Sequence, residues 1–92
     1  SGRKPLPYLG VSWSRQGDFQ VVNALREGSA AWDMGLQHGD ALMTINGEKV
    51  EDADKWLRTR KPGEKLKIKV LRQGKEVELR GKIGSYPAPQ FH

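Results

Sequence analysis

Turn-forming residues limit the folds open to this chain more than any other sequence feature. Eleven glycines and five prolines are spread through 92 residues, which favours short strands and turns over long helices. A chain of this length builds one compact domain and not two. Hydrophobic residues at 36% and charged residues at 29% allow a modest core beneath a charged surface. The lack of cysteine excludes a disulfide scaffold and a zinc site made of four thiolates.

No apolar run approaches the roughly 18 residues that a membrane-spanning helix needs, and no signal-peptide pattern is visible. We therefore expect no membrane insertion. The dipeptide Ser1-Gly2 resembles a cloning remnant, and we expect the chain to be one domain taken from a larger protein.

Basic residues outnumber acidic residues by 16 to 11, and the excess lies in the second half of the chain. There Lys65, Lys67 and Lys69 alternate with apolar residues, which predicts a strand with one wet face and one buried face. A basic half-chain can also attract nucleic acid or anionic lipid. No aromatic side chain lies between these lysines to stack on a base. The solvated strand face is the better interpretation, and we expect no nucleic-acid partner.

The periodicity of apolar residues predicts five or six strands and two short helices. Ser29 can cap the first helix and Gly35 can end it in the left-handed conformation. Asp52 can cap the second helix, which we expect to run to about Arg60. Strands are predicted over 9–14, 19–25, 41–45, 66–73 and 76–83, with a brief strand remnant at Val50. This pattern predicts an α+β, mainly β fold: a small, partly open β-barrel or sandwich capped by two helices.

Four short motifs occur within residues 8–47 in a characteristic order. They are Tyr8-Leu9-Gly10-Val11, Gly28-Ser29-Ala30-Ala31 with Gly35-Leu36, Gly39-Asp40, and Ile45-Asn46-Gly47. In this order and spacing they resemble the bacterial, circularly permuted form of the PDZ domain. The resemblance covers residues 8–84, so we expect a PDZ-like domain there and tails at 1–7 and 85–92. Ala30 stands where the family often has proline, and Trp13 is bulkier than the usual aliphatic residue, which bears on the size of any pocket.

The resemblance implies that the domain binds a peptide C-terminus or an extended segment. Three backbone N–H groups, at residues 9, 10 and 11, would converge on a carboxylate. The strand at 9–14 would pair with the peptide, and the helix at 53–60 would form the opposite wall. Arg3 or Lys4 would reinforce the carboxylate site by its charge. The predicted ligand-binding residues are Leu9, Gly10, Val11, Ser12, Trp13, Ala53, Leu57 and Arg60.

Domains of this kind usually accompany bacterial proteases of four types: high-temperature-requirement serine proteases, site-two proteases, carboxy-terminal processing proteases and glycyl aminopeptidase-like metallopeptidases. The segments 8–10 and 31–36 most resemble the last group. The resemblance therefore implies a location in the cell envelope or periplasm. The expected partner is a peptide or protein C-terminus, or another domain of the parent protease. We expect the isolated domain to be a monomer.

The sequence predicts no catalytic residue, metal site or cofactor. A catalytic triad needs a nucleophile, a base and an orienting group within hydrogen-bond reach. The two histidines, His38 and His92, lie in a predicted turn and at the chain end, and no metal-binding histidine pair occurs. Two alternatives to peptide binding remain: a structural spacer whose groove is filled by Trp13 or by the chain itself, and a basic surface that binds nucleic acid or anionic lipid.

Overall fold

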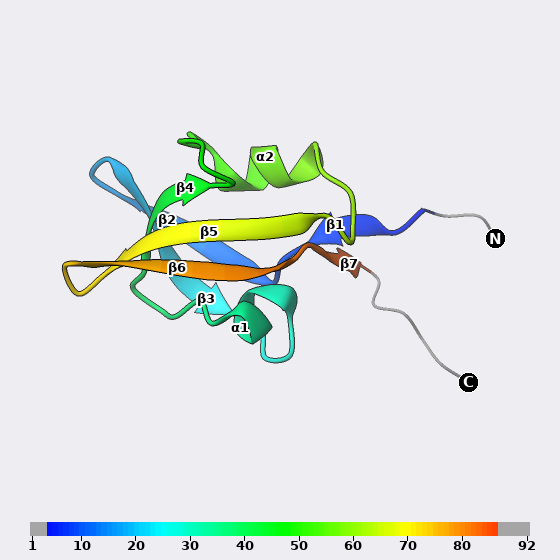
Figure 1. The fold of residues 1–92 in the computed structure, drawn as a ribbon, viewed down its shortest axis with the longest axis horizontal. Coiled ribbons are helices and arrows are strands. Elements are labelled where there is room, and N and C mark those ends of the chain that lie inside the picture. Colours follow the sequence, from blue (N-terminus) through cyan, green and yellow to red (C-terminus); the bar gives the residue numbers. More distant parts are fainter. Residues whose placement is uncertain (1–3, 87–92) are drawn as a thin grey trace.

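Seven strands and two short helices make up residues 4–86, the part of the chain described by the computed structural model (Figure 1). In chain order these are β1 (Leu6–Tyr8), β2 (Val11–Gln16), β3 (Phe19–Leu25), α1 (Ala30–Met34), β4 (Ala41–Ile45), α2 (Ala53–Arg58), β5 (Lys65–Arg72), β6 (Lys75–Lys82) and β7 (Gly84–Tyr86). The predicted mainly β fold with two short helices is confirmed. None of the helices within residues 4–86 is long and apolar enough to cross a bilayer.

Five of the strands form one antiparallel sheet in the order β2-β3-β4-β5-β6, which leaves β2 and β6 at its edges. The other two strands, β1 and β7, pair with each other in a second small sheet. Neither sheet closes on itself, so the architecture is a pair of open sheets and not a closed barrel. The strand count exceeds the predicted five or six because of the β1–β7 pair.

The β1–β7 pair occupies segments that the sequence analysis assigned largely to tails. Leu6 lies opposite Tyr86 and Tyr8 lies opposite Gly84. The rings of Tyr8 and Tyr86 lie 5.4 Å apart at 47°, within the range that aromatic pairs favour. Strands of three residues are too short to show an apolar period, so only their pairing reveals them. The predicted strand remnant at Val50 is wrong, since the chain there makes only an isolated bridge between Ile45 and Glu48.

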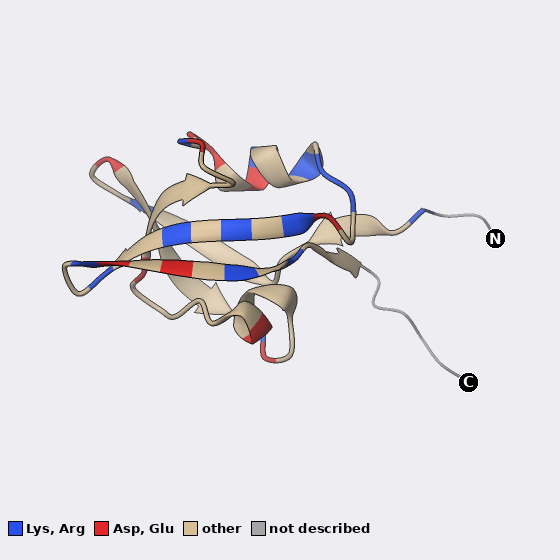
Figure 2. Cartoon of the chain, in the orientation of Figure 1, with Lys and Arg blue, Asp and Glu red and all other residues tan. Residues whose placement is uncertain are grey.

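The centre of the core lies on β5. Leu66, Ile68 and Val70 are at most 2% exposed, whereas Lys65 and Lys67 on the opposite face are exposed. Figure 2 shows the alternation as blue bands separated by tan along β5. The predicted alternation is therefore confirmed. Full burial of such aliphatic side chains contributes about 1.5–3 kcal/mol each.

Local hydrogen bonds fix both helices where the sequence places their starts. The Ser29 hydroxyl accepts a hydrogen bond from the Trp32 N–H at 3.3 Å, and Gly35 ends α1 at φ 98°. The Asp52 carboxylate accepts from the Lys55 N–H at 3.0 Å. Helix α2 ends at Arg58, two residues before the predicted Arg60. The reason is a tightened last turn, in which the N–H groups of residues 59 and 60 donate to carbonyls three residues back.

Candidate functional site

The outer edge of β2 carries backbone groups that face away from the sheet. The Arg26 N–H donates to the Gly10 carbonyl at 2.8 Å, just beside the pair formed by Val11 and Leu25. In an antiparallel ladder this bond makes Val11–Leu25 a pair without hydrogen bonds of its own. The N–H and C=O of Val11 therefore point away from β3, toward the open edge.

Residues 9 and 10 connect β1 to β2 and use their carbonyls but not their N–H groups. The Leu9 carbonyl accepts from the Ala31 N–H at 2.8 Å, and the Gly10 carbonyl accepts from Arg26. Within residues 4–86, neither the Leu9 N–H nor the Gly10 N–H donates a hydrogen bond. Two consecutive donors thus precede the outward N–H of Val11.

Gly10 is required by its surroundings. Its φ is +81°, a conformation that side chains other than glycine rarely adopt. A Cβ at this position would overlap the Cβ and Oγ of Ser29. The family resemblance implies that the Gly10 N–H meets a ligand carboxylate. The structure adds a packing reason, which is the cap residue of α1.

The predicted residues of β2 and the preceding loop divide between core and surface. Leu9 is 3% exposed and belongs to the core. Val11 and Trp13 are half-buried and pack against that core from its rim. Ser12 is exposed. Trp13 therefore fills space beside the core while keeping part of its surface accessible.

Side chains of the β2–β3 hairpin hold the beginning of helix α2. Gln20 makes two hydrogen bonds there: its Nε2 donates to the Val50 carbonyl at 2.9 Å, and its Oε1 accepts from the Ala53 N–H at 2.8 Å. Arg15, near the end of β2, donates to the Glu51 carbonyl at 3.0 Å. The helix also contacts β1, which precedes β2. The start of α2 is thus tied to the β2–β3 hairpin, and the helix packs against the strand that precedes β2.

The predicted residues of α2 do not share one environment. Ala53 is buried, and Leu57 is half-buried against the core. Arg60 lies beyond the end of the helix, and its guanidinium sits 5.0 Å from the centroid of the Trp56 ring. This cation–π geometry directs Arg60 toward its own helix. Trp56 itself packs against the core.

The structure thus brings seven of the eight predicted residues to β2, α2 and the loop before β2, with Arg60 just beyond α2. We call this set the β2–α2 site. Lys4, proposed to reinforce the carboxylate site, is exposed, while Arg3 and His92 lie outside the described residues. A hollow of about 330 Å³ also touches residues 10–12, but residues 24–26 of β3 and the loop after it form its other wall. That hollow was not predicted.

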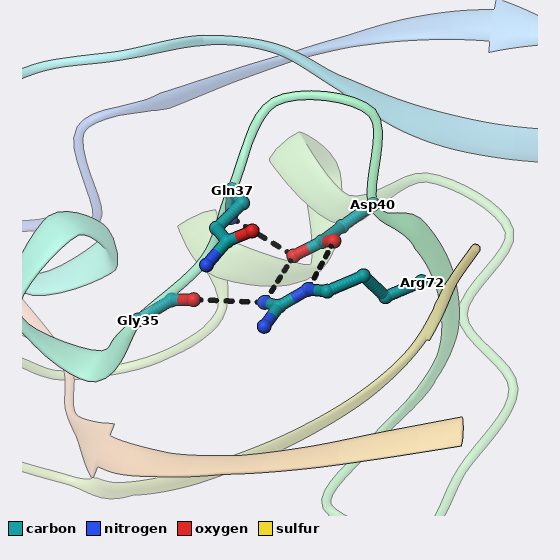
Figure 3. Close-up of polar contacts among 4 residues, drawn as sticks. All are labelled: Gly35, Gln37, Asp40 and Arg72. Atoms are coloured by element: carbon teal, nitrogen blue, oxygen red, sulfur yellow. Dashed lines mark hydrogen bonds and ion pairs between the residues drawn. The ribbon is translucent and has the colours of Figure 1, made fainter. Parts of the chain in front are cut away.

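A buried ion pair, which the sequence analysis missed, holds the loop after α1 (Figure 3). Asp40 is 1% exposed and accepts two hydrogen bonds from Arg72, both at 2.8 Å. The same carboxylate accepts from the Gln37 N–H at 2.9 Å, and Arg72 also donates to the Gly35 carbonyl at 2.9 Å. The hydrogen bond to Asp40 raises the pKa of Arg72 above its ordinary value, against the opposing effect of burial. The Gly39-Asp40 motif marks one partner, but nothing local in the sequence marks Arg72.

Within residues 4–86, no group of three or more histidine, cysteine or acidic side chains is arranged to hold a metal ion. His38 is exposed in the loop before Asp40. The features that stand out chemically are therefore backbone donors and an unpaired strand edge.

Known proteins are similar to this chain in both sequence and fold. The chain is 32% identical over 71 residues to a protein of Hahella chejuensis named as a DegP-like periplasmic serine endoprotease, covering 74% of this chain and 15% of that protein. It is 42% identical over 62 residues to a protein of Agrobacterium fabrum named as a zinc metalloprotease, covering 64% of this chain and 16% of the relative. The chain thus spans only about a sixth of these relatives.

Among solved structures, the HtrA-type protease AlgW with decapeptide has a similar fold, with a TM-score of 0.78 and 29% identity. The match covers 92% of this chain and 31% of that one. The family model described as the PDZ domain matches residues 7–83. The open sheets, the two capped helices and this match over most of the chain agree, and the chain belongs to the PDZ domain family.

Proposed function

We propose that this chain is a non-catalytic module that captures a peptide C-terminus or an extended segment at the β2–α2 site. The peptide adds to β2 as a further strand, and its terminal carboxylate accepts hydrogen bonds from the N–H groups of residues 9–11. An apolar terminal side chain lies against Val11, Trp13 and Leu57.

The open edge of β2 is the observation that carries this proposal. Val11 directs its N–H and C=O outward, and the preceding N–H groups of Leu9 and Gly10 donate to nothing within residues 4–86. Strand addition needs such an edge, and a carboxylate is recognised by consecutive backbone donors. A few hydrogen bonds and one buried side chain give a Kd in the micromolar range, about −8 kcal/mol.

We further propose that the module serves a larger bacterial protease of the cell envelope. The support is the similarity to a protein named as a periplasmic serine endoprotease and to one named as a zinc metalloprotease. Its role there is to hold a chain end near an active site elsewhere in the parent. Both a serine endoprotease and a zinc metalloprotease occur among the relatives that share this domain.

The decisive experiment is an amide-shift titration of the isotope-labelled domain with peptides that end in a free apolar residue. The same peptides with amidated ends serve as the control. We expect shifts at residues 9–14 and 53–60 that disappear on amidation. If no peptide perturbs these residues, the proposal fails and the domain is a spacer whose site is filled by Trp13.

A pair of variants on α2 sharpens the test. Leu57→Ala removes part of the apolar wall and is expected to weaken binding about five- to tenfold, because roughly 1 kcal/mol of apolar contact is lost. Lys55→Ala changes an exposed residue of the same helix and should leave the affinity unchanged. Equal losses in the two variants would contradict the proposed wall.

A further inference from the structure

One outward face of the sheet concentrates positive charge. Lys65, Lys67 and Lys69 project from β5, and the residues directly opposite them on β6 are Lys82, Arg80 and Glu78. Figure 2 shows the blue bands on β5 beside the blue and red bands of β6. We call the five cations Lys65, Lys67, Lys69, Arg80 and Lys82 the basic face.

The opposed cations of the basic face destabilise the pairing of β5 with β6. Lys65 lies opposite Lys82, and Lys67 lies opposite Arg80. Like charges directly opposite each other destabilise an antiparallel pair. A face that served only solvation would intersperse the two signs, but here the same sign recurs across the strands.

Glu78 is the one carboxylate among these six side chains, and it does not relieve the repulsion between Lys65 and Lys82. Glu78 is bound by Arg80, with an Nη2–Oε2 distance of 2.9 Å. The hydrogen bond from Arg80 lowers the pKa of Glu78, and the charges of Lys67 and Lys69 add to that effect. Lys65 and Lys82 have no acidic residue opposite them.

The basic face is also hollowed. A depression of about 430 Å³ is lined by four of its cations, Lys65, Lys67, Arg80 and Lys82, together with Asn46, Leu66 and Gly81. Asn46 is fixed there, since its Oδ1 accepts from the Lys67 N–H at 2.8 Å. An anionic group that enters this depression meets several cations at once.

We propose that the basic face binds an extended acidic segment of a polypeptide. Side chains on one face of an extended strand repeat about every 6.6–6.8 Å, and the lysines of β5 follow that same repeat. Aspartate or glutamate at alternate positions of the partner therefore meets Lys65, Lys67 and Lys69 in register. Bound carboxylates would also relieve the repulsion between the opposed cations.

Other anionic partners fit this face less well. Neither β5 nor β6 contains an aromatic residue, and single-stranded nucleic acid is held largely by stacking on aromatic side chains. The large hydrophobic residues that are exposed within residues 4–86 are Leu6, Phe19, Trp32 and Tyr86, all on other elements. A membrane-surface site usually combines basic residues with such apolar anchors. A basic face with neither aromatic side chains nor apolar anchors favours an acidic polypeptide as its partner.

The test uses a fluorescent peptide in which glutamate alternates with serine, blocked at both ends so that it offers no free carboxyl terminus. We expect the anisotropy to rise on binding and amide shifts to map to residues 65–69 and 80–82. In the K65Q/K67Q/K69Q variant the affinity should fall about tenfold, because each exposed ion pair contributes a factor of roughly two to three. The variant should unfold at a higher temperature than the wild type, because its opposed like charges are gone.

The matched control is K49Q/K55Q/K75Q, which removes the same charge from exposed lysines outside the basic face. An equal loss of affinity in this control would mean that only net charge matters, and would overturn the proposal. Vesicles containing phosphatidylglycerol and an oligothymidine are titrated in parallel. Tighter binding of either one at residues 65–69 and 80–82 would also overturn it.

Discussion

Gly10, at the junction between β1 and β2, packs so closely against Ser29 that no larger residue fits there. The missing side chain of Gly10 leaves the space that the cap residue of α1 occupies. Gly10→Ala should therefore reduce the free energy of unfolding by about 2–4 kcal/mol, from strain at positive φ and from overpacking. Urea denaturation followed by fluorescence measures the loss.

Gly17→Ala is the control for the backbone term alone. Its φ is +59°, and an added Cβ there would meet nothing within 4 Å. The expected cost is about 1 kcal/mol. If both alanine variants lose the same stability, the packing of Ser29 against residue 10 does not contribute to the free energy of unfolding.

Arg72 and Asp40 give a second prediction at the scale of single residues. Arg72→Met leaves a nearly buried carboxylate with only the Gln37 N–H as partner. We expect a loss of about 2–4 kcal/mol, less than for a fully buried pair because the arginine side chain is 24% exposed. Thermal and urea unfolding measure it.

The pH dependence of that loss follows from the sign of the pKa shift. The pKa of Arg72 is raised, so its contribution is complete below the ordinary arginine value and disappears only at still higher pH. The loss in Arg72→Met should thus be equal at neutral and mildly alkaline pH. Arg80→Gln is the control, since Arg80 is 74% exposed in its pair with Glu78, and no measurable loss is expected there. A similar loss in both variants would contradict the special role of the buried pair.

At the scale of elements, one side chain of β3 positions the helix of the proposed site. Gln20 bonds both the carbonyl before α2 and the first N–H of α2. Gln20→Ala should cost about 1–2 kcal/mol of stability and weaken peptide binding, because α2 loses its fixed distance from β2. Denaturation and peptide titration measure the two effects.

Gln16→Ala serves as the comparison, since Gln16 is exposed at the end of β2. It should change neither property. Unaltered peptide affinity in Gln20→Ala would show that α2 needs no tether to act as a wall.

The elements themselves were largely predictable. Strands 19–25 and 41–45 were predicted with the observed bounds, and the caps at Ser29 and Asp52 mark the observed helix starts. Such signals act within a few residues, where backbone dihedral preferences and local hydrogen bonds determine the secondary structure. The end of α2 was placed two residues late because the tightened turn at Thr59 has no distinct sequence signal.

At the scale of the whole molecule, stability is expected to be uneven. β5 lies between β4 and β6 and carries three residues that are at most 2% exposed, whereas β1 and β7 form a two-stranded sheet. Amide protons of residues 66–70 should exchange only through global unfolding. Those of residues 6–8 and 84–86 should exchange faster, by local opening. Hydrogen exchange followed by NMR checks this, and equal protection in both sheets would mean that the domain unfolds as a single unit.

The sequence by itself determined what depends on near neighbours: the strand period on β5 and the helix caps at Ser29 and Asp52. These features follow from backbone dihedral preferences and from which face of an element is apolar. The predicted residues of the β2–α2 site came instead from the family motifs and what that resemblance implies, and their role in binding stays a prediction.

Only the tertiary structure decided which distant groups meet. It pairs β1 with β7, joins Asp40 to Arg72, ties Gln20 to the start of α2, and sets Lys65 and Lys67 opposite Lys82 and Arg80. The physical reason is that each of these contacts joins residues far apart in the chain. Such a contact depends on strand register and sheet order, which emerge when the whole core packs at once.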